Sequence, residues 1–172
     1  EGDLWKGVVD PPPPPASVPG RTGYIWEQDW INRSHIREEE DWPQAQSFAH
    51  GIDFLKVNHR SDNWFLQIET FDPHEPYFAH QKYRDLYPHE YEGESFDWNA
   101  YVMIEGYSQV EIDHLRFEYA ALLSMCDAHL GKVLDAMDEL DLWKDTMLIV
   151  NTDHGHMLGE HDYMGKGGLP LY

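Results

Sequence analysis

Residues 108–140 read SQVEIDHLRFEYAALLSMCDAHLGKVLDAMDEL. Apolar side chains recur in this stretch at spacings of three and four residues, which is the repeat of one face of an α-helix. The members of the stripe are Ile112, Leu115, Tyr119, Leu122, Cys126, Leu130, Val133, Met137 and Leu140. The sequence therefore predicts one long amphipathic helix, over roughly residues 108–140, whose stripe packs against a core.

Two short apolar runs flank this helix, at residues 64–70 (WFLQIET) and 146–152 (TMLIVNT). Runs of this length, rich in aromatic and β-branched residues, are typical of strands buried on both faces. A strand, a helix and a second strand in this order indicate a βαβ crossover in a parallel sheet. We therefore predict an α/β domain with a mostly parallel central sheet and helices on both faces.

The N-terminal part divides into a connection and a helical region. Residues 1–23 contain five consecutive prolines, which favour an extended polyproline II spacer, although a docking ligand for a proline-recognition domain is the alternative. Apolar spacing over residues 29–58 then predicts an amphipathic helix with acidic residues at its N-terminus. We expect residues 24–172 to form one incomplete domain.

The composition excludes several classes of protein. Twelve Lys and Arg against 32 Asp and Glu give a net charge of −20, and 41% of the residues are hydrophobic. Such a chain is too apolar for a disordered acidic tail, and its negative field disfavours nucleic acids and anionic membrane surfaces. No apolar run is long enough for a membrane helix. A single cysteine excludes an internal disulfide and leaves the compartment open.

Polar clusters follow both predicted strands. Asp72, Pro73 and His74 come after the first strand, and Asp153 and His154 come after the second. In open α/β sheets, ligands bind outside the carboxyl ends of the strands. The sequence therefore predicts that these two clusters meet at one site.

Asp153 and His154 are candidate ligands of a divalent metal. They place a carboxylate oxygen beside an imidazole nitrogen, and Gly155 is expected to let the backbone turn so that both reach one point. Ca²⁺, Mn²⁺ or Mg²⁺ would need further carboxylates from elsewhere. The alternative is an ordinary strand-end turn capped by the aspartate.

Lys166 and His74 are the candidate catalytic residues. Lys166 lies between two glycines in a chain with few cations, so we interpret it as a group that grips a substrate oxygen rather than a solvated surface charge. His74 stands between two prolines, which hold its ring at a fixed angle; a loop histidine bonded to a carbonyl is the alternative. His156 and His161 could support the site. The other histidines are interpreted as structural: His35, His50, His59, His80, His89, His114 and His129.

Three ordered motifs resemble the sulfatase family of the alkaline phosphatase superfamily. They are residues 71–77 (FDPHEPY), the helix containing Tyr119, and residues 151–161 (NTDHGHMLGEH) followed by Lys166. The resemblance covers roughly residues 60–172. It implies an alkaline-phosphatase-like three-layer domain with a mostly parallel central sheet.

The resemblance also implies roles for the candidate residues. Asp153 and His154 would be two ligands of a divalent metal, usually calcium in sulfatases and manganese in some related hydrolases. Lys166 would contact a sulfate oxygen near the metal and the nucleophile. His74 would bind the sulfate or assist the leaving-group oxygen.

One part of the family pattern is missing. Sulfatases open with a strand carrying paired aspartates, followed by Cys-x-Pro-x-Arg or Ser-x-Pro-x-Arg, whose first residue becomes the formylglycine nucleophile. Cys126 does not fit this pattern, and the match at residues 17–21 follows a proline run and is interpreted as chance. We therefore expect an internal piece of a catalytic domain, catalytically silent and weakly metal-binding when isolated, with the nucleophile outside this chain.

The function implied is hydrolysis of a small sulfuric ester, as in an arylsulfatase. A phosphonate monoester or phosphodiester hydrolase of the same superfamily is the first alternative, because nothing in the sequence separates a sulfuryl from a phosphoryl centre. The second is a binding module that retains the fold without the chemistry. The substrate and the oligomeric state remain open.

Overall fold

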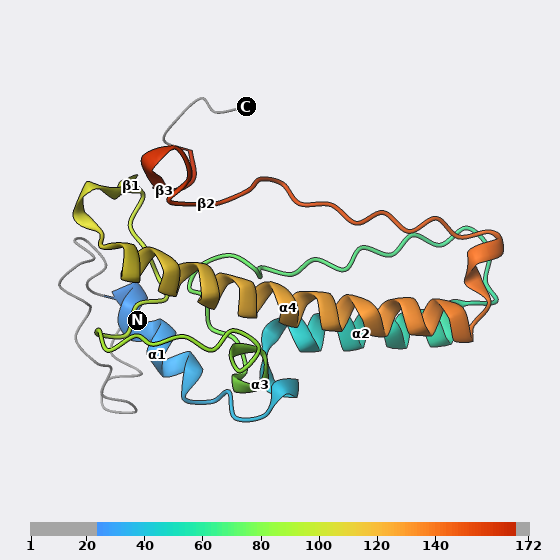
Figure 1. The fold of residues 1–172 in the computed structure, drawn as a ribbon. Helices are drawn as coiled ribbons and strands as arrows, with labels where there is room; N and C mark the ends of the chain where they lie inside the picture. The colour runs from blue at the N-terminus through green and yellow to red at the C-terminus, as the bar shows by residue number, and fades with distance from the viewer. Residues whose placement is uncertain (1–23, 168–172) are drawn as a thin grey trace.

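The computed structural model describes residues 24–167 (Figure 1). The predicted connection, residues 1–23, lies outside this range. The helical elements are α1 (Tyr24–Arg33), η1 (Glu39–Asp41), α2 (Pro43–Asn58), α3 (Gln81–Arg84), η2 (Ile104–Gly106), α4 (Gln109–Glu139), η3 (Leu142–Lys144) and η4 (Glu160–Asp162). The strands are β1 (Val102–Met103), β2 (Met157–Leu158) and β3 (Tyr163–Gly165).

The long helix predicted from the apolar stripe is confirmed as α4. It begins after Ser108, whose hydroxyl accepts a hydrogen bond from the backbone N–H of Glu111 while the Glu111 carboxylate bonds back to Ser108. This reciprocal cap satisfies N–H groups that lack partners within the helix. The apolar stripe of α4 packs inward as predicted. The shorter helix α2 lies along the C-terminal part of α4 (Figure 1).

The helix predicted within residues 29–58 is confirmed only in its second part. The structure divides the region into α1, the turn η1 and then α2. Pro43 occupies the first turn of α2, where a residue without an N–H costs nothing, so the helix begins there. The acidic residues 39–41 therefore form a separate 3₁₀ turn and not the first turn of α2.

The two predicted strands are the main correction. Residues 64–70 and 146–150 are extended, but within residues 24–167 neither run joins a β-ladder. Leu66 and Leu148 pack towards the helices, whereas Phe65 and Met147 are 85% and 83% exposed. The prediction of burial on both faces is therefore wrong for the structure described, because a helical layer covers one face of each run and no strand pairs with its backbone.

The sheet that does form is small and antiparallel. Its order is β1-β3-β2, with Val102 opposite Met164 and Leu158 also opposite Met164. Leu158 and Met164 are buried against the same core as the N-terminal half of α4. No helix in residues 24–167 is long and apolar enough to cross a membrane.

Leu122→Ala is expected to lower the free energy of unfolding by about 2–5 kcal/mol, because it leaves a cavity in a closely packed core. Leu122 is fully buried, whereas the adjacent Leu123 on the same helix is 45% exposed. The matched control Leu123→Ala is expected to cost about 1 kcal/mol at most. Urea unfolding of both variants measures the difference, and equal losses would contradict the packing described.

Candidate active site

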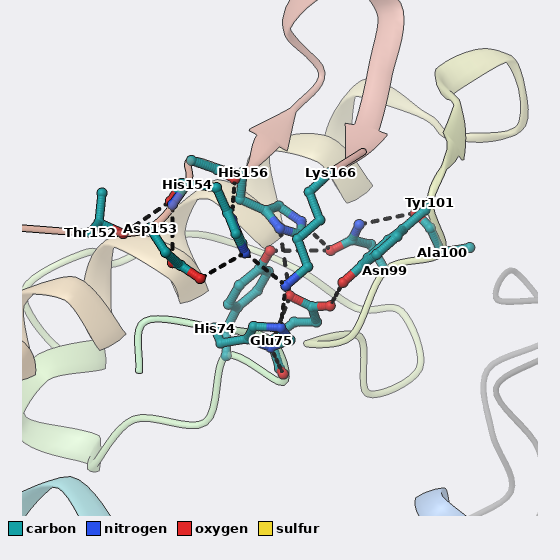
Figure 2. Close-up of polar contacts among 12 residues, drawn as sticks. His74, Glu75, Asn99, Ala100, Tyr101, Thr152, Asp153, His154, His156 and Lys166 are labelled. Carbon is teal, nitrogen blue, oxygen red and sulfur yellow. Dashed lines mark hydrogen bonds and ion pairs between the residues drawn. The ribbon is translucent and has the colours of Figure 1, made fainter. Parts of the chain in front are cut away.

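The four residues predicted from the sequence lie together in one polar cluster (Figure 2). The Lys166 amine donates to His74 Nε2 and lies 3.3 Å from His154 Nε2. His154 Nε2 in turn lies 3.6 Å from Asp153 Oδ2. The structure thus places Lys166 between the two loops that the sequence predicted to meet.

The two loops meet because two extended segments end on the same side of the molecule. Residues 64–70 follow α2 and residues 146–150 follow α4, and both run back along α4 from the end where these helices finish (Figure 1). Packing on the same helices therefore brings His74 and His154 together. The predicted meeting point is right, although parallel strand pairing is not what produces it.

His74 presents a defined nitrogen to the cluster. Its Nδ1 lies 2.7 Å from the carbonyl oxygen of Glu75 and 3.2 Å from Glu75 Oε2. An N–H at Nδ1 that donates to these oxygens leaves a lone pair on Nε2, which faces Lys166. The ring of Phe71 packs against the imidazole, with the centroids 4.2 Å apart. The loop therefore holds the ring in one orientation.

Asp153 and His154 offer a donor set suited to a divalent cation. His154 Nδ1 lies 2.9 Å from the Gly155 carbonyl oxygen, so that its Nε2 keeps a lone pair on the side of Asp153. Metal-binding histidines commonly donate their second ring N–H to a carbonyl in this way. The Asp153 side chain is 86% exposed and the His154 side chain 45%, so further ligands can approach both.

The prediction that Gly155 allows the backbone to turn at this point is wrong. A Cβ added at this position would meet no atom within 4 Å, and its φ is not in the left-handed region. The turn that joins Asp153 to His154 is instead held by the backbone N–H of His154, which donates to Asp153 Oδ1 over 3.0 Å. The local polar contact, and not glycine's conformational freedom, shapes this turn.

Gly165 is the glycine on which the site depends. Its φ is +107°, and an added Cβ would lie 3.0 Å from the backbone Cα of Tyr101 and closer still to the Tyr101 ring. A residue with a side chain would be strained here and would push β3 away from Tyr101. Because Lys166 follows directly, Gly165 helps to determine where the Lys166 amine lies.

A polar layer beside the cluster includes His156, predicted as a supporting residue, and also Glu75, Asn99 and Tyr101, which were not predicted; Glu75 and Asn99 are buried. The Tyr101 hydroxyl donates to Glu75 Oε1, and His156 lies 3.5 Å from Glu75 Oε2 and 3.3 Å from Asn99 Oδ1 (Figure 2). Burial lowers the pKa of His156 to about 4, although the Glu75 carboxylate opposes this. Asn99 and Tyr101 come from an irregular stretch with no sequence pattern, so only their positions in space connect them to the site.

The chain is similar to proteins of one known family. The family model described as Sulfatase matches residues 19–171. This chain belongs to the sulfatase family. The family implies an alkaline-phosphatase-like α/β fold and a hydrolase activity, and the match includes all four residues of the cluster.

Several curated relatives resemble this sulfatase chain. An arylsulfatase of Clostridium perfringens is 25% identical, over 80% of this chain and 31% of its own length. A choline-sulfatase of Rhizobium meliloti is 29% identical, over 80% of this chain and 32% of its own. A multifunctional alkaline phosphatase superfamily protein, PehA of Trinickia caryophylli, is 28% identical over 61% of this chain and 26% of its own length. The chain thus spans about a third or less of these relatives, and no solved structure matches it significantly.

Cys126 is only partly buried on α4 of this sulfatase chain, so the prediction that it belongs to the core is met in part. Burial, with a contribution from Asp72, raises the pKa of its thiol to about 12. A thiol with this pKa is not ionised at neutral pH and is a poor nucleophile. Ser17, the first residue of the match at residues 17–21, lies outside the described residues.

Asp72→Asn is expected to stabilise the folded chain at pH 8 but not at pH 3.5. Burial raises the pKa of Asp72 from 3.8 to about 6. Because the pKa of Asp72 is higher in the folded than in the unfolded chain, its carboxyl contributes to the free energy of unfolding at low pH. This contribution is lost as the pH rises from 3.8 through 6. At about 1.36 kcal/mol per pKa unit, ionised Asp72 costs the wild type up to about 3 kcal/mol.

Urea unfolding at both pH values measures this effect. Asp53→Asn, at an exposed position on α2, serves as the matched control and should show no pH-dependent difference from the wild type. A variant Asp72→Asn that is equally stable, relative to the wild type, at both pH values would contradict the raised pKa.

Proposed function

We propose that the protein hydrolyses small sulfate esters, as an arylsulfatase does. The observation that supports this most is the position of Lys166, whose amine contacts both His74 and His154. Cleavage of an anionic ester needs positive charge at its equatorial oxygens and a proton for the departing oxygen. A lysine beside a histidine and a candidate metal pair meets both needs.

Each residue has a proposed role. Lys166 would bind a sulfate oxygen, and His74, once protonated on Nε2 as well as on Nδ1, would donate the Nε2 proton to the leaving-group oxygen. Asp153 and His154 would hold a divalent cation, with Ca²⁺ preferred and Mn²⁺ or Mg²⁺ as alternatives. When bound, such a cation supplies Lewis-acid polarisation of the ester oxygen. The nucleophile is proposed to be a formylglycine outside this chain.

The second candidate is a phosphonate monoester or phosphodiester hydrolase. The similarity to PehA, described as a multifunctional alkaline phosphatase superfamily protein, favours this reading. The same lysine, histidine and metal pair would serve a phosphoryl centre equally well. A binding module that retained the fold without the chemistry is a third candidate.

Paired substrates test these candidates on the intact protein. We expect kcat/KM for an aryl sulfate to exceed that for an aryl phosphodiester with the same leaving group. A clear preference for the phosphodiester would support the second candidate. Absence of turnover on both, in a protein shown to be folded and metal-loaded, would support the binding module.

Asp153→Asn is expected to weaken Ca²⁺ binding by at least about 10-fold, because it replaces a charged oxygen ligand by a neutral one. Equilibrium dialysis of the intact protein measures the affinity independently of activity. The matched control is Asp135→Asn, at an exposed position on α4. Unchanged affinity in Asp153→Asn would contradict the proposed role as a ligand.

A further inference from the structure

A second cluster of metal-binding side chains lies away from the candidate active site. One ligand atom from each of His89, His114 and Glu118 lies within 4.8 Å of the other two. His114 and Glu118 are four residues apart on α4, and therefore on the same face of the helix. His89 comes from the irregular chain after α3. The sequence had indicated only structural roles for both histidines.

The hydrogen bonds of the two histidines orient their rings towards one another. His89 Nδ1 lies 2.8 Å from the carbonyl oxygen of Tyr87, and the ring of His114 stacks on that of Tyr91. An N–H at His89 Nδ1 that donates to Tyr87 leaves a lone pair on His89 Nε2, which faces His114. The near nitrogens, His89 Nε2 and His114 Nδ1, are 2.7 Å apart. At that distance His114 Nδ1–H donates to the lone pair of His89 Nε2, and a cation that replaced this proton would be held between the two nitrogens.

The third ligand is also oriented. Arg84 Nη2 and Nε donate to Glu118 Oε1 over 2.6 Å and 3.1 Å. This pairing fixes the carboxylate and leaves Oε2 as the oxygen that could bind a cation. Hydrogen bonds of this kind orient ligands in known metal sites. All three side chains are therefore held by contacts outside the cluster.

The cluster opens into a cavity of its own. A cavity of 390 Å³ is lined by His89, His114 and Glu118, together with Arg84 and Tyr91 among others. None of the four residues of the candidate active site lines it. A cation held by the three side chains would keep an open coordination position that faces this cavity.

We propose that His89, His114 and Glu118 bind a zinc ion. Two imidazoles and one carboxylate with an open fourth position form a common zinc-binding set. Nitrogen ligands favour a borderline cation such as Zn²⁺ over Ca²⁺, which prefers oxygen. The site therefore selects a different ion from that proposed for Asp153 and His154, and zinc here would tie the chain around His89 to α4.

Binding requires a small movement and the loss of a proton. With Zn–N distances of about 2.0–2.1 Å and tetrahedral angles, the two nitrogens would be ~3.3 Å apart. His89 lies in irregular chain and can move by that amount, whereas α4 and the stacked ring of Tyr91, 3.8 Å away between centroids, hold His114. Any proton shared by the two nitrogens would be displaced, so affinity should rise with pH.

Calorimetric titration of the chelator-treated 172-residue chain with Zn²⁺ tests the proposal. We expect one equivalent of Zn²⁺ to bind, with affinity at least 10-fold weaker in His89→Ala and in Glu118→Gln. His50→Ala, at an exposed position on α2, is the matched control and should bind as the wild type does. Far-UV circular dichroism establishes that each variant is folded.

A variant of the candidate active site distinguishes zinc binding at His89, His114 and Glu118 from zinc binding at Asp153 and His154. Asp153→Asn should retain zinc binding. Zinc binding that is lost in Asp153→Asn but kept in His89→Ala would assign the ion to the other cluster and overturn the proposal. Failure of the wild-type chain to bind zinc, or equal affinity in the wild type and His89→Ala, would also overturn it.

Discussion

Lys166→Ala is expected to lower kcat/KM of the intact protein for an aryl sulfate by about 10²–10³-fold. The Lys166 amine donates to His74 and lies 3.3 Å from His154 Nε2, so its charge lies beside both proposed functional groups. Charge that develops on the sulfate oxygens would lose this partner in the variant. Steady-state kinetics with the metal-loaded protein measure the loss.

Lys144→Ala is the matched control for this experiment. The Lys144 side chain is 73% exposed and pairs with Asp141 in the turn after α4. Removing it deletes the same charge at the opposite end of the extended residues 146–150 from the site (Figure 1), so activity should stay at the wild-type level. Wild-type activity in Lys166→Ala as well would remove the main support for the proposed function.

His74→Gln is expected to lower kcat by about 10²–10⁴-fold for an alkyl sulfate and by much less for an aryl sulfate. An alkoxide is a poor leaving group and needs a proton as it departs, whereas a phenoxide can leave without one. The structure presents His74 Nε2 towards Lys166, while Nδ1 is occupied by Glu75. Comparison of the two substrate types therefore isolates proton transfer from binding.

The control variant is His50→Gln, at an exposed position on α2, which should leave both rates unchanged. An equal loss on both substrates in His74→Gln, mainly in KM, would mean that His74 binds the sulfate group instead. That is the other role that the family resemblance allows. No loss on either substrate would contradict both roles.

Local sequence patterns were enough to predict the long helix α4 but not the pairing of the strands. The stripe from Ile112 to Leu140 repeats with the helical period, so residues close in sequence were enough to define α4 and its buried face. The strand predictions failed because an apolar run does not specify its neighbours. Residues 64–70 are extended, as predicted, but whether Phe65 is buried depends on a second layer that no local pattern encodes.

The candidate site shows the same division. Asp153, His154, Lys166 and His74 could be selected from their chemistry and from ordered motifs. Glu75, Asn99 and Tyr101 were not selected. Glu75 lies in the motif 71–77, but its role, like those of Asn99 and Tyr101, comes only from contacts beside the cluster.

The sequence by itself determined α4, the chemical types of the four candidate site residues and the family. Only the tertiary structure decided that Lys166 lies between His74 and His154, and that His89 faces His114. The physical reason is that a helix is stabilised by contacts three or four residues apart, which leave a period in the sequence. Contacts such as that between His74 and Lys166, 92 residues apart, depend on how whole segments pack and leave no such period.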